Sequence, residues 1–552
     1  MSAHSQLKLF WCLAALLVGA VFLVYAQTFG FEALQLDDAC YTTICPFVSS
    51  GFNWQNVKTA FTGDFSWAGI WMPLTSVTYM LTISLFGPSA GAHHAVNVVF
   101  HALNAVLFFG LLVRLIAKVR ADASSDRSAL LIAFTAAALW ALHPLRVESV
   151  AWIASRKDTV FTFFTLIGLL CWNGSRWFLA WVAMALACLS KPTAVCFPFL
   201  AMTVEFVGTR SFGRFDCRAA LRLIGRYLPC FLIALATGLV ATYSQHHMQY
   251  GEDLPLFSQP LPWRALNAAV SLGMQLCHAA CPVGLTYFYR PMPGQLPLHA
   301  ATGLVSLAVA CLLLTAVWVK SKCPLRQKVF WTALWFAASL GPTLGLFASF
   351  GRQAFADRFT YVPMMAFSIL IATTDWGRFA KGAGAALVAA TLAFAGVSAW
   401  YAGTFRDNIT VHERVIECDP EDPEAVRCIG STLLSKGDPD KAIPYLRRAL
   451  QLDPSNHAGV DLFFALYTRR APGDMEEAWK MTAPIRADPS LDTDGLILSV
   501  LSREALKAGD EASARRLLEA QARVENPQFS SQARAILKSL DERKLGPRAG
   551  VQ

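Results

Sequence analysis

The sequence has little charge. Asp, Glu, Lys and Arg make up 15% of its 552 residues, whereas hydrophobic residues make up 55%. So low a charged fraction excludes an ordinary soluble globular protein. The apolar runs cease after about Tyr401, and a segment rich in acidic and basic residues follows from Arg406. We therefore predict a polytopic membrane domain over 1–405 and a soluble domain over 406–552.

The sequence also lacks several signatures of catalysis and metal binding. It contains no P-loop, no Gly-rich dinucleotide fingerprint, no Gly-x-Ser-x-Gly elbow and no zinc motif. These absences disfavour nucleotide-driven pumps and serine hydrolases. The 14 cysteines fall mostly in or near apolar runs, without C-x-x-C pairs of metal-site spacing. Cys40 and Cys45 could form a small disulfide or remain free thiols.

Eleven apolar runs are candidate membrane spans, because a crossing needs about 20 mainly apolar residues. The first run has no convincing small-residue cleavage site, so we interpret it as an uncleaved helix. The candidates are 8–26, 93–116, 129–142, 158–173, 177–190, 193–208, 227–244, 301–319, 328–347, 359–374 and 383–401.

The net charge of +9 reflects basic loops between these runs rather than a nucleic-acid surface. Alternating the spans from a cytoplasmic N-terminus places every basic loop on one side, as orientation signals require. The unusual polar segments then share the opposite, outer side. The weaker runs 73–86 and 263–281 would break this parity if they crossed. We assign them to helices at the outer interface.

The stretch 143–158 is a dense group of ionisable residues between two strongly apolar runs. Charges beside a hydrocarbon core are costly unless they face water, a partner helix or a polar substrate. Arginine binds phosphate oxygens with a forked geometry, and a cation near a departing phosphate stabilises its charge. The alternative is an interfacial anchor whose cations reach the headgroups. The ionisable residues here are His143, Arg146, Glu148, Arg156, Lys157 and Asp158.

Other polar groups on the outer side are candidates for chemistry. The pair Asp37-Asp38 could act as a general base, bind a divalent cation or cap a loop. His94, Asn97, His101 and Asn104 share one face of a helix, where they either bond neighbouring helices or, at His94, take part in function. Lys191, and the segment holding Asp357, Arg358 and Tyr361, add cations on the same side; Asp357 and Arg358 could equally be a satisfied ion pair.

The C-terminal part contains a repeat. Asp419-Pro420 recurs as Asp453-Pro454 after 34 residues and as Asp488-Pro489 after 35 more. This is the tetratricopeptide period, and it predicts an α-solenoid of about three repeats.

Taken together, these blocks resemble the transmembrane and tetratricopeptide repeat-containing proteins, and we interpret the chain as a bacterial member. That family has a membrane domain of the glycosyltransferase type C fold, shared with protein O-mannosyltransferases. The fold class expected is therefore all-α: about 11 transmembrane helices followed by a tetratricopeptide-repeat solenoid. The matching blocks are Asp37-Asp38, 71–75, 94–97, 101–104, 143–148, 156–158, Lys191-Pro192 and 357–361.

The resemblance implies an inverting transfer of a sugar from a polyprenyl-phosphate donor to an acceptor hydroxyl, expected to be protein Ser or Thr. It implies Asp38, or its neighbour Asp37, as the base. The expected ligands of the donor phosphate are Arg156, Lys157, Lys191, Arg358 and Arg146. The expected supporting residues are His94, His143, Glu148, Asp158, Asp357 and Tyr361.

The same resemblance implies partners and a location. The expected partners are the lipid bilayer, the polyprenyl-phosphate sugar donor and an acceptor protein held by the repeats, with no nucleic acid. We expect a multi-pass protein of the bacterial inner membrane with its repeats in the periplasm. No cofactor is expected, although a divalent metal stays open. Two alternatives remain: transfer to a glycolipid or glycan, including whole-oligosaccharide transfer, and a non-catalytic membrane-anchored repeat scaffold.

Overall fold

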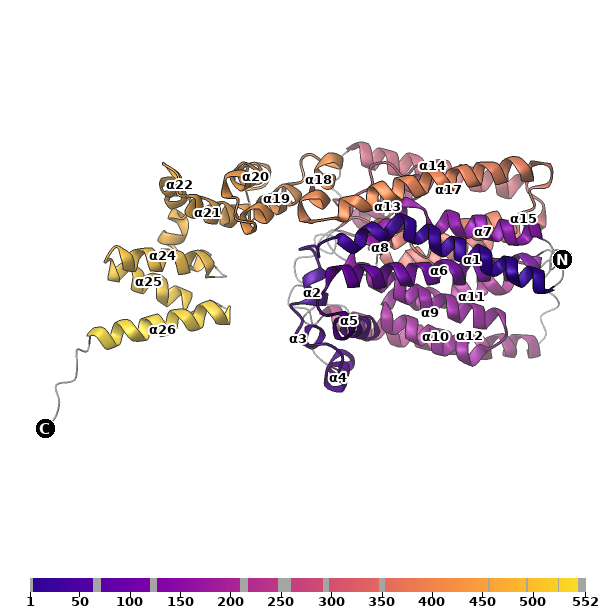
Figure 1. The fold of residues 1–552 in the computed structure, drawn as a ribbon, viewed down its shortest axis with the longest axis horizontal. Coiled ribbons are helices and arrows are strands. Elements are labelled where there is room, and N and C mark those ends of the chain that lie inside the picture. Colours follow the sequence, from indigo (N-terminus) through magenta and orange to yellow (C-terminus); the bar gives the residue numbers. More distant parts are fainter. Residues whose placement is uncertain are drawn as a thin grey trace. The chain divides into compact units, whose positions relative to one another are not determined.

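The fold is helical throughout the part of the chain that the structure describes. This computed structural model describes residues 3–62, 71–119, 127–208, 217–246, 260–290, 297–346, 353–454, 457–492, 495–524 and 526–544. Every regular element in these ranges is an α-helix or a short 3₁₀-helix (Figure 1). The all-α prediction is therefore confirmed. The chain divides into two compact units, Met1–Asp419 and Pro420–Gln552.

Five helices of the first unit are long and apolar enough to cross a membrane, which supports a multi-pass membrane protein. A sixth crossing is obtained if the helix pair Arg127–Ala141 and Pro144–Ala151, bent by 59°, counts as one span. The five belong to α1 (Ala3–Tyr25), α6 (Ala90–Val119), α12 (Cys217–His246), α14 (Pro297–Lys320) and α17 (Ala380–Ala402).

Six further helices that correspond to predicted spans are shorter than the roughly 20 residues that a crossing needs. A 9-residue helix such as α16 is only about 13 Å long at about 1.5 Å per residue, less than half the hydrocarbon thickness. The count of eleven therefore stays a prediction. The shorter helices are α7 (Arg127–Ala141), α9 (Arg156–Asn173), α10 (Trp177–Ser190), α11 (Phe197–Phe206), α15 (Cys323–Leu340) and α16 (Met365–Thr373).

Two helices correspond to the runs assigned to the outer interface. They are α5 (Pro73–Phe86) and α13 (Leu261–Ala280). Neither belongs to the five candidate spans found among the described residues. Their interfacial position stays a prediction.

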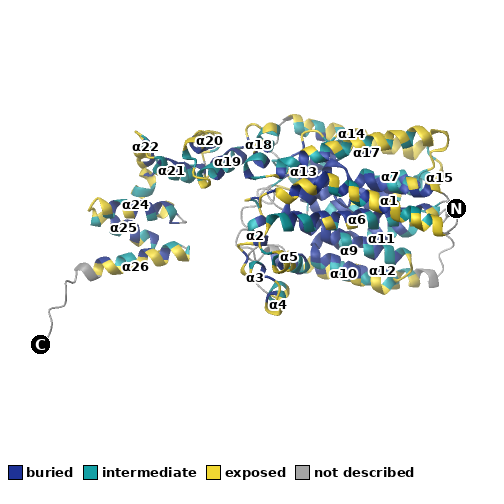
Figure 2. Cartoon of the chain, in the orientation of Figure 1, coloured by how far each residue is buried: buried dark blue, intermediate teal, exposed yellow. Residues whose placement is uncertain are grey.

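Helix α6 forms the centre of the first unit. It packs against α1, α7 and α9, and its apolar window is more than half buried. In contrast, α14 buries almost none of its apolar window, and Figure 2 shows long exposed stretches along it. An apolar surface of this kind suits contact with lipid.

The 143–158 stretch runs through the interior rather than over the outer surface. It folds into η4 (Pro144–Arg146), α8 (Val147–Ala151), η5 (Ile153–Ser155) and the start of α9. Each residue from 141 to 162 is buried. Pro144 begins the first turn, and a ring nitrogen of His143 accepts the Leu145 backbone N–H at 3.2 Å. Short helical turns satisfy the backbone and let the charges lie inside, where they face partner helices; the position of this stretch on the outer side of the membrane stays a prediction.

The first unit extends one helix beyond the predicted boundary at 405. Helix α18 (Asn408–Cys418) is held by the Arg414 Nε, which donates to the Leu285 carbonyl at 2.9 Å. Arg290 adds a two-pronged ion pair to Asp419, with distances of 2.5 and 2.7 Å. A change in composition marks the end of the apolar runs, but these contacts decide where the compact unit ends.

The second unit consists of short helices that pack on their neighbours in sequence. Three Asp residues outside the repeated Asp-Pro pairs cap helix starts: Asp422, Asp438 and Asp510 each accept a backbone N–H three residues later. The helices are α19 (Pro423–Ser435), α20 (Pro439–Leu452), α21 (Ala458–Arg469), α22 (Asp474–Met481), α23 (Ala483–Ala487), α24 (Leu496–Lys507), α25 (Glu511–Gln521) and α26 (Pro527–Lys544). The tetratricopeptide solenoid stays a prediction.

Gly430 allows α19 and α20 to approach closely. A Cβ atom at this position would lie 2.6 Å from the Leu446 Cγ, whereas a Cβ at Gly459 in α21 would meet nothing nearer than 3.9 Å. We expect Gly430→Ala to destabilise the second unit by about 1–3 kcal/mol through overpacking. Gly459→Ala, the matched control, should be neutral or stabilising by up to about 1 kcal/mol. Thermal unfolding of the full chain, read by protease cleavage of the second unit, measures both; equal effects would contradict this close approach.

Candidate functional site

Seven ionisable residues, some of them distant in sequence, meet where several short elements of the first unit begin. The elements are α2 (Asp38–Thr42), α8, the start of α9, the turn before η6 (Pro192–Cys196) and η9 (Asp357–Thr360). The residues are Asp37, Asp38, Glu148, Lys157, Asp158, Lys191 and Arg358. All seven were predicted site residues. We refer to them as the charge cluster.

Asp38 is the fixed carboxylate of the charge cluster. It is fully buried, and its two oxygens accept the backbone N–H groups of Leu34 and Ala154, each at 2.8 Å. Burial raises the pKa of the Asp38 carboxyl from its usual value near 3.8 to about 7, although the two backbone hydrogen bonds oppose the rise. A carboxyl that titrates near neutral pH can accept a proton effectively.

Asp37 differs from Asp38 in its surroundings. Its side chain is exposed, yet it interacts electrostatically with Lys157 and Arg358. It therefore lies at the mouth of the charge cluster rather than inside it.

Asp158 and Lys191 form a buried ion pair. The Lys191 Nζ lies 2.5 Å from the Asp158 Oδ1, and each side chain is less than a tenth exposed. The ammonium group also lies 5.7 Å from the ring centres of Phe161 and of Phe359. The second carboxylate oxygen, Asp158 Oδ2, is buried without a hydrogen-bond partner among the described residues.

Arg358 is held by Glu148, which is fully buried. The Glu148 carboxylate accepts both a guanidinium N–H and, at 2.8 Å, the backbone N–H of Arg358. The guanidinium lies 5.0 Å from the Trp152 ring centre. Glu148 thus uses both oxygens on one residue, which fixes the direction of the Arg358 side chain.

Asp357 anchors the backbone that carries Arg358. The Tyr289 hydroxyl donates to its carboxylate at 3.2 Å, and a ring nitrogen of His278 lies 3.4 Å from the Oδ1. Asp357 is therefore not the ion-pair partner of Arg358, which was one of the two interpretations. Tyr289 and His278 were not predicted, because they come from a segment with no charge pattern.

Lys157 is the least committed cation of the charge cluster. Its ammonium group lies 5.2 Å from the Tyr41 ring centre, and it forms no hydrogen bond or ion pair with any residue that the structure describes. It interacts electrostatically with Asp37, Asp38 and Asp158. A buried cation with no direct partner is available to an anionic ligand.

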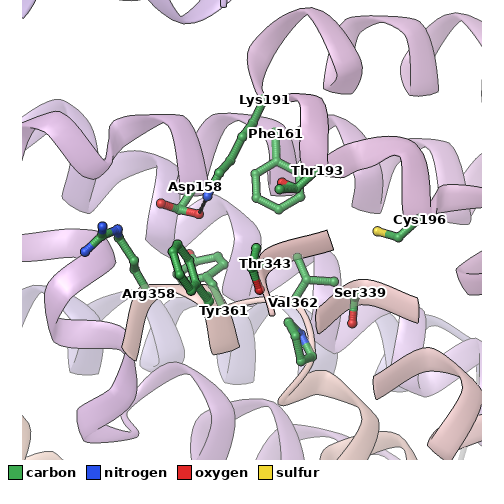
Figure 3. Close-up of a pocket in the computed structure, with 12 residues that line it drawn as sticks. Asp158, Phe161, Lys191, Thr193, Cys196, Ser339, Thr343, Arg358, Tyr361 and Val362 are labelled. Carbon is green, nitrogen blue, oxygen red and sulfur yellow. Dashed lines mark hydrogen bonds and ion pairs between the residues drawn. The ribbon is translucent and has the colours of Figure 1, made fainter. Parts of the chain in front are cut away.

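A small pocket opens beside these residues. It is lined by Asp158, Lys191 and Arg358, together with aromatic and hydroxyl side chains (Figure 3). Its volume is about 10 Å³, which is the space of about one water molecule or one hydroxyl group.

Arg156 lies outside the charge cluster. Its guanidinium donates to Asn97 Oδ1 at 2.8 Å, to Thr82 Oγ1 at 2.9 Å and to the His93 carbonyl at 2.8 Å. The Thr78 carbonyl and the His93 ring nitrogen take its remaining N–H groups. Every donor is therefore used in joining α5, α6 and α9.

Arg146 is likewise held in the interior. It donates to the carbonyl and the hydroxyl of Thr360, at 3.0 and 2.6 Å, and stacks 5.2 Å from the Tyr361 ring centre. Tyr361 in turn bonds His101 at 2.6 Å. These two predicted residues thus form a polar core around α6 that the charge cluster does not include.

The polar stripe of α6 makes contacts between helices. Asn97 donates to the Trp152 carbonyl at 3.0 Å, and Asn104 to the Thr159 carbonyl at 2.8 Å. His94 lies 3.4 Å from the Glu32 carbonyl, and His143 lies 3.1 Å from the Ala279 carbonyl. The geometry favours the interhelical interpretation of the stripe and brings neither histidine into the charge cluster.

Metal and thiol chemistry have little geometric support in the described ranges. No group of three or more His, Cys, Asp or Glu side chains there is arranged to hold a metal ion. Cys40 and Cys45 are both free thiols. Metal independence itself stays a prediction.

The Asp158–Lys191 pair provides a test of the buried charges. We expect Lys191→Met to destabilise the first unit by about 3–5 kcal/mol, because it leaves the Asp158 carboxylate buried without a counter-ion. The double variant Lys191→Met, Asp158→Asn should recover most of that loss. Thermal unfolding in detergent measures both. A single variant as stable as the wild-type protein would show that the pair is solvated.

Comparison with known proteins shows distant similarity to one group of enzymes. Protein O-mannosyl-transferase TMTC1 of Homo sapiens is 29% identical over 208 residues, which are 36% of this chain and 21% of the human protein. Protein O-mannosyl-transferase F38B6.6 of Caenorhabditis elegans is 27% identical over 166 residues, or 30% of this chain and 21% of that protein. The similarity thus spans about a fifth of these relatives. No family model and no solved structure matches the chain.

Proposed function

We propose that the protein is a membrane glycosyltransferase that moves a sugar from a polyprenyl-phosphate donor to an acceptor hydroxyl. The observation that carries this proposal is the charge cluster: a buried carboxylate with a pKa near 7 beside three cations, Lys157, Lys191 and Arg358. The names of the similar proteins support the activity and make mannose the first sugar to test. The acceptor proposed is a protein Ser or Thr.

The charge cluster suits a single displacement. Asp38 takes the proton of the acceptor hydroxyl while the oxygen of that hydroxyl bonds the sugar C1. The bond from C1 to the phosphate oxygen breaks, and the configuration at C1 is inverted. The electron pair of that bond leaves on the phosphate, whose charge Lys157 and Arg358 stabilise. No metal ion takes part in this proposal.

Asp38 is the better base of the two adjacent carboxylates. Its oxygens are held by two backbone N–H groups, so their position is set before the acceptor binds, and burial has already brought its pKa close to neutral. Asp37 is exposed and has no comparable restraint on its oxygens among the described residues. We propose that Asp37 attracts the side chains of Lys157 and Arg358 electrostatically and so orients them at the mouth of the charge cluster.

The predicted arginines divide into two roles. Arg358 keeps guanidinium N–H groups that no described residue accepts, whereas all donors of Arg156 are used by the protein. We therefore propose Lys157, Lys191 and Arg358 as the phosphate ligands. Arg156 and Arg146 position the helices that carry them.

We propose further that the second unit is a tetratricopeptide solenoid that recruits the acceptor. The period of the Asp-Pro pairs and the close approach at Gly430 support it. The proposed location is the inner membrane of a bacterium, with the charge cluster and the repeats on the periplasmic side. The type C glycosyltransferase fold belongs to this same proposal.

Asp38→Asn tests the base. We expect transfer of mannose from polyprenyl-phosphate mannose to fall by about 10²–10⁴-fold, because general-base catalysis contributes that much. Asp37→Asn, the matched neighbour, should retain most activity. A transfer assay with purified enzyme and a synthetic donor measures both rates. Separate peptide and glycolipid acceptors in that assay identify the acceptor class. An Asp38→Asn variant of full activity would exclude this mechanism, and transfer to neither acceptor would favour a scaffold.

The pH profile tests the same carboxylate. Only the ionised Asp38 can accept a proton, so we expect kcat/KM to be high above pH 7 and to fall about tenfold per unit below it. Asp37→Asn should leave this acidic limb, the fall of kcat/KM below pH 7, in place. A limb centred near pH 4 instead would indicate a solvated carboxylate, and so would point to Asp37.

Lys157→Met tests phosphate binding without breaking an ion pair. Losing a charge-assisted hydrogen bond to the donor phosphate is worth about 1.5–3 kcal/mol, so KM for the lipid donor should rise about 10- to 100-fold. Thermal stability should be maintained, because no described residue pairs directly with this ammonium group. An unchanged KM would remove Lys157 from the site.

A further inference from the structure

The small pocket contains a hydroxyl group that no described residue bonds. Thr193 lines the pocket at the start of η6, is 5% exposed, and its Oγ1 has no hydrogen-bond partner among the described residues. Asp158 Oδ2, in the same lining, is also buried without one. In the view of Figure 3 Thr193 lies beside Phe161, while Asp158 lies between Lys191 and Arg358.

The other hydroxyl groups of the lining are satisfied. Ser339 donates to the Trp335 carbonyl at 2.7 Å, and Thr343 donates to the Leu340 carbonyl at 2.8 Å. The Tyr361 hydroxyl bonds His101 and Asn104. Since buried polar groups are nearly always paired with protein or water, Thr193 Oγ1 and Asp158 Oδ2 are the lining atoms that stay available to a polar group entering the pocket.

The size and the neighbours of the pocket identify that group chemically. A volume of about 10 Å³ admits one hydroxyl group but not a sugar ring or a phosphate. A hydroxyl can donate to a carboxylate oxygen and also bond a threonine hydroxyl. Arg358 and Lys191, the proposed phosphate ligands, line the same pocket, so a group bound here is close to a phosphate bound there.

We infer that this pocket receives one hydroxyl group of the sugar on the donor, and that Thr193 is a specificity-determining residue which recognises it. The inference rests on the proposed function and extends it to the choice of sugar. The bound hydroxyl donates to Asp158 and pairs with Thr193, while the ring of Phe161 packs against the apolar side of the pocket. A donor that lacks this hydroxyl leaves both protein atoms unpaired, and the enzyme therefore rejects it.

Deoxy-sugar donors test the inference. The probes are polyprenyl-phosphate mannose and its 2-, 3-, 4- and 6-deoxy analogues, assayed by kcat/KM with the full-length wild type, Thr193→Val and Thr343→Val. The wild type should discriminate against one analogue more strongly than against the others. Thr193→Val should reduce that single ratio by about 3- to 10-fold, the worth of one hydrogen bond. Thr343→Val removes a hydroxyl that is already paired, and should leave the ratio unchanged.

A second measurement separates this inference from the proposed function. Thermal stabilisation by mannose 1-phosphate is compared with stabilisation by inorganic phosphate in the same three proteins. A preference for the sugar phosphate that weakens only in Thr193→Val supports the inference. If all three proteins show the same preference and the same deoxy profile, the role of Thr193 is overturned while the transferase stands. If the wild type transfers no sugar and binds neither phosphate, the proposed function fails and this inference fails with it.

Discussion

Charge buried among apolar helices must be paired, and the arrangement of the first unit follows from that constraint. The 143–158 stretch carries several ionisable groups into an interior where every residue from 141 to 162 is buried. Several groups there are stabilised by a partner from another element: Asp158 by Lys191, Arg156 by Asn97, Arg146 by Thr360. These contacts join α5, α6, α9 and the two turns η6 and η9 into one frame. Lys157 is the exception among the described residues, since it has only a ring contact.

The same constraint divides the cations by role. A guanidinium whose five N–H groups all bond the protein, as in Arg156, strengthens the frame and has nothing left for a ligand. Lys157, which lies over the Tyr41 ring without a direct counter-ion in the described ranges, retains its full hydrogen-bonding capacity. Arg358 is an intermediate case. Glu148 restrains it through two contacts, but other guanidinium N–H groups of Arg358 have no acceptor among the described residues. Availability, rather than charge alone, is what marks the proposed phosphate ligands.

How far the sequence predicts such a site depends on which physical signal each residue carries. Asp38, Lys191 and Arg358 were found because a charge between apolar runs is costly and so stands out. Tyr289 and His278 carry no charge pattern, and they enter the site only through contacts with Asp357, which is far away in the sequence. Thr193 is close to Lys191 in sequence, but it carries no charge and lines the pocket without a signal of its own. Arg156 was among the expected phosphate ligands because arginine suits phosphate, but the acceptors that Asn97, Thr82 and His93 offer to its guanidinium cannot be predicted from spacing. The number of spans shows the same limit, since short apolar helices such as α11 and α16 have the composition of a span without its length.

The sequence by itself determined the all-helical class, the apolar first part, the more polar repeat-bearing part, and the set of ionisable residues from which a site could be built. Those properties depend on composition and period, which act locally along the chain. Only the tertiary structure decided that the 143–158 stretch is buried, that Asp38 rather than Asp37 is the restrained carboxylate, and that no described residue bonds the Thr193 hydroxyl. Each of these properties depends on which groups elsewhere in the chain form a hydrogen bond with the residue. An unmade hydrogen bond in a buried site costs free energy, so a paired residue is structural and an unpaired one is available to a substrate.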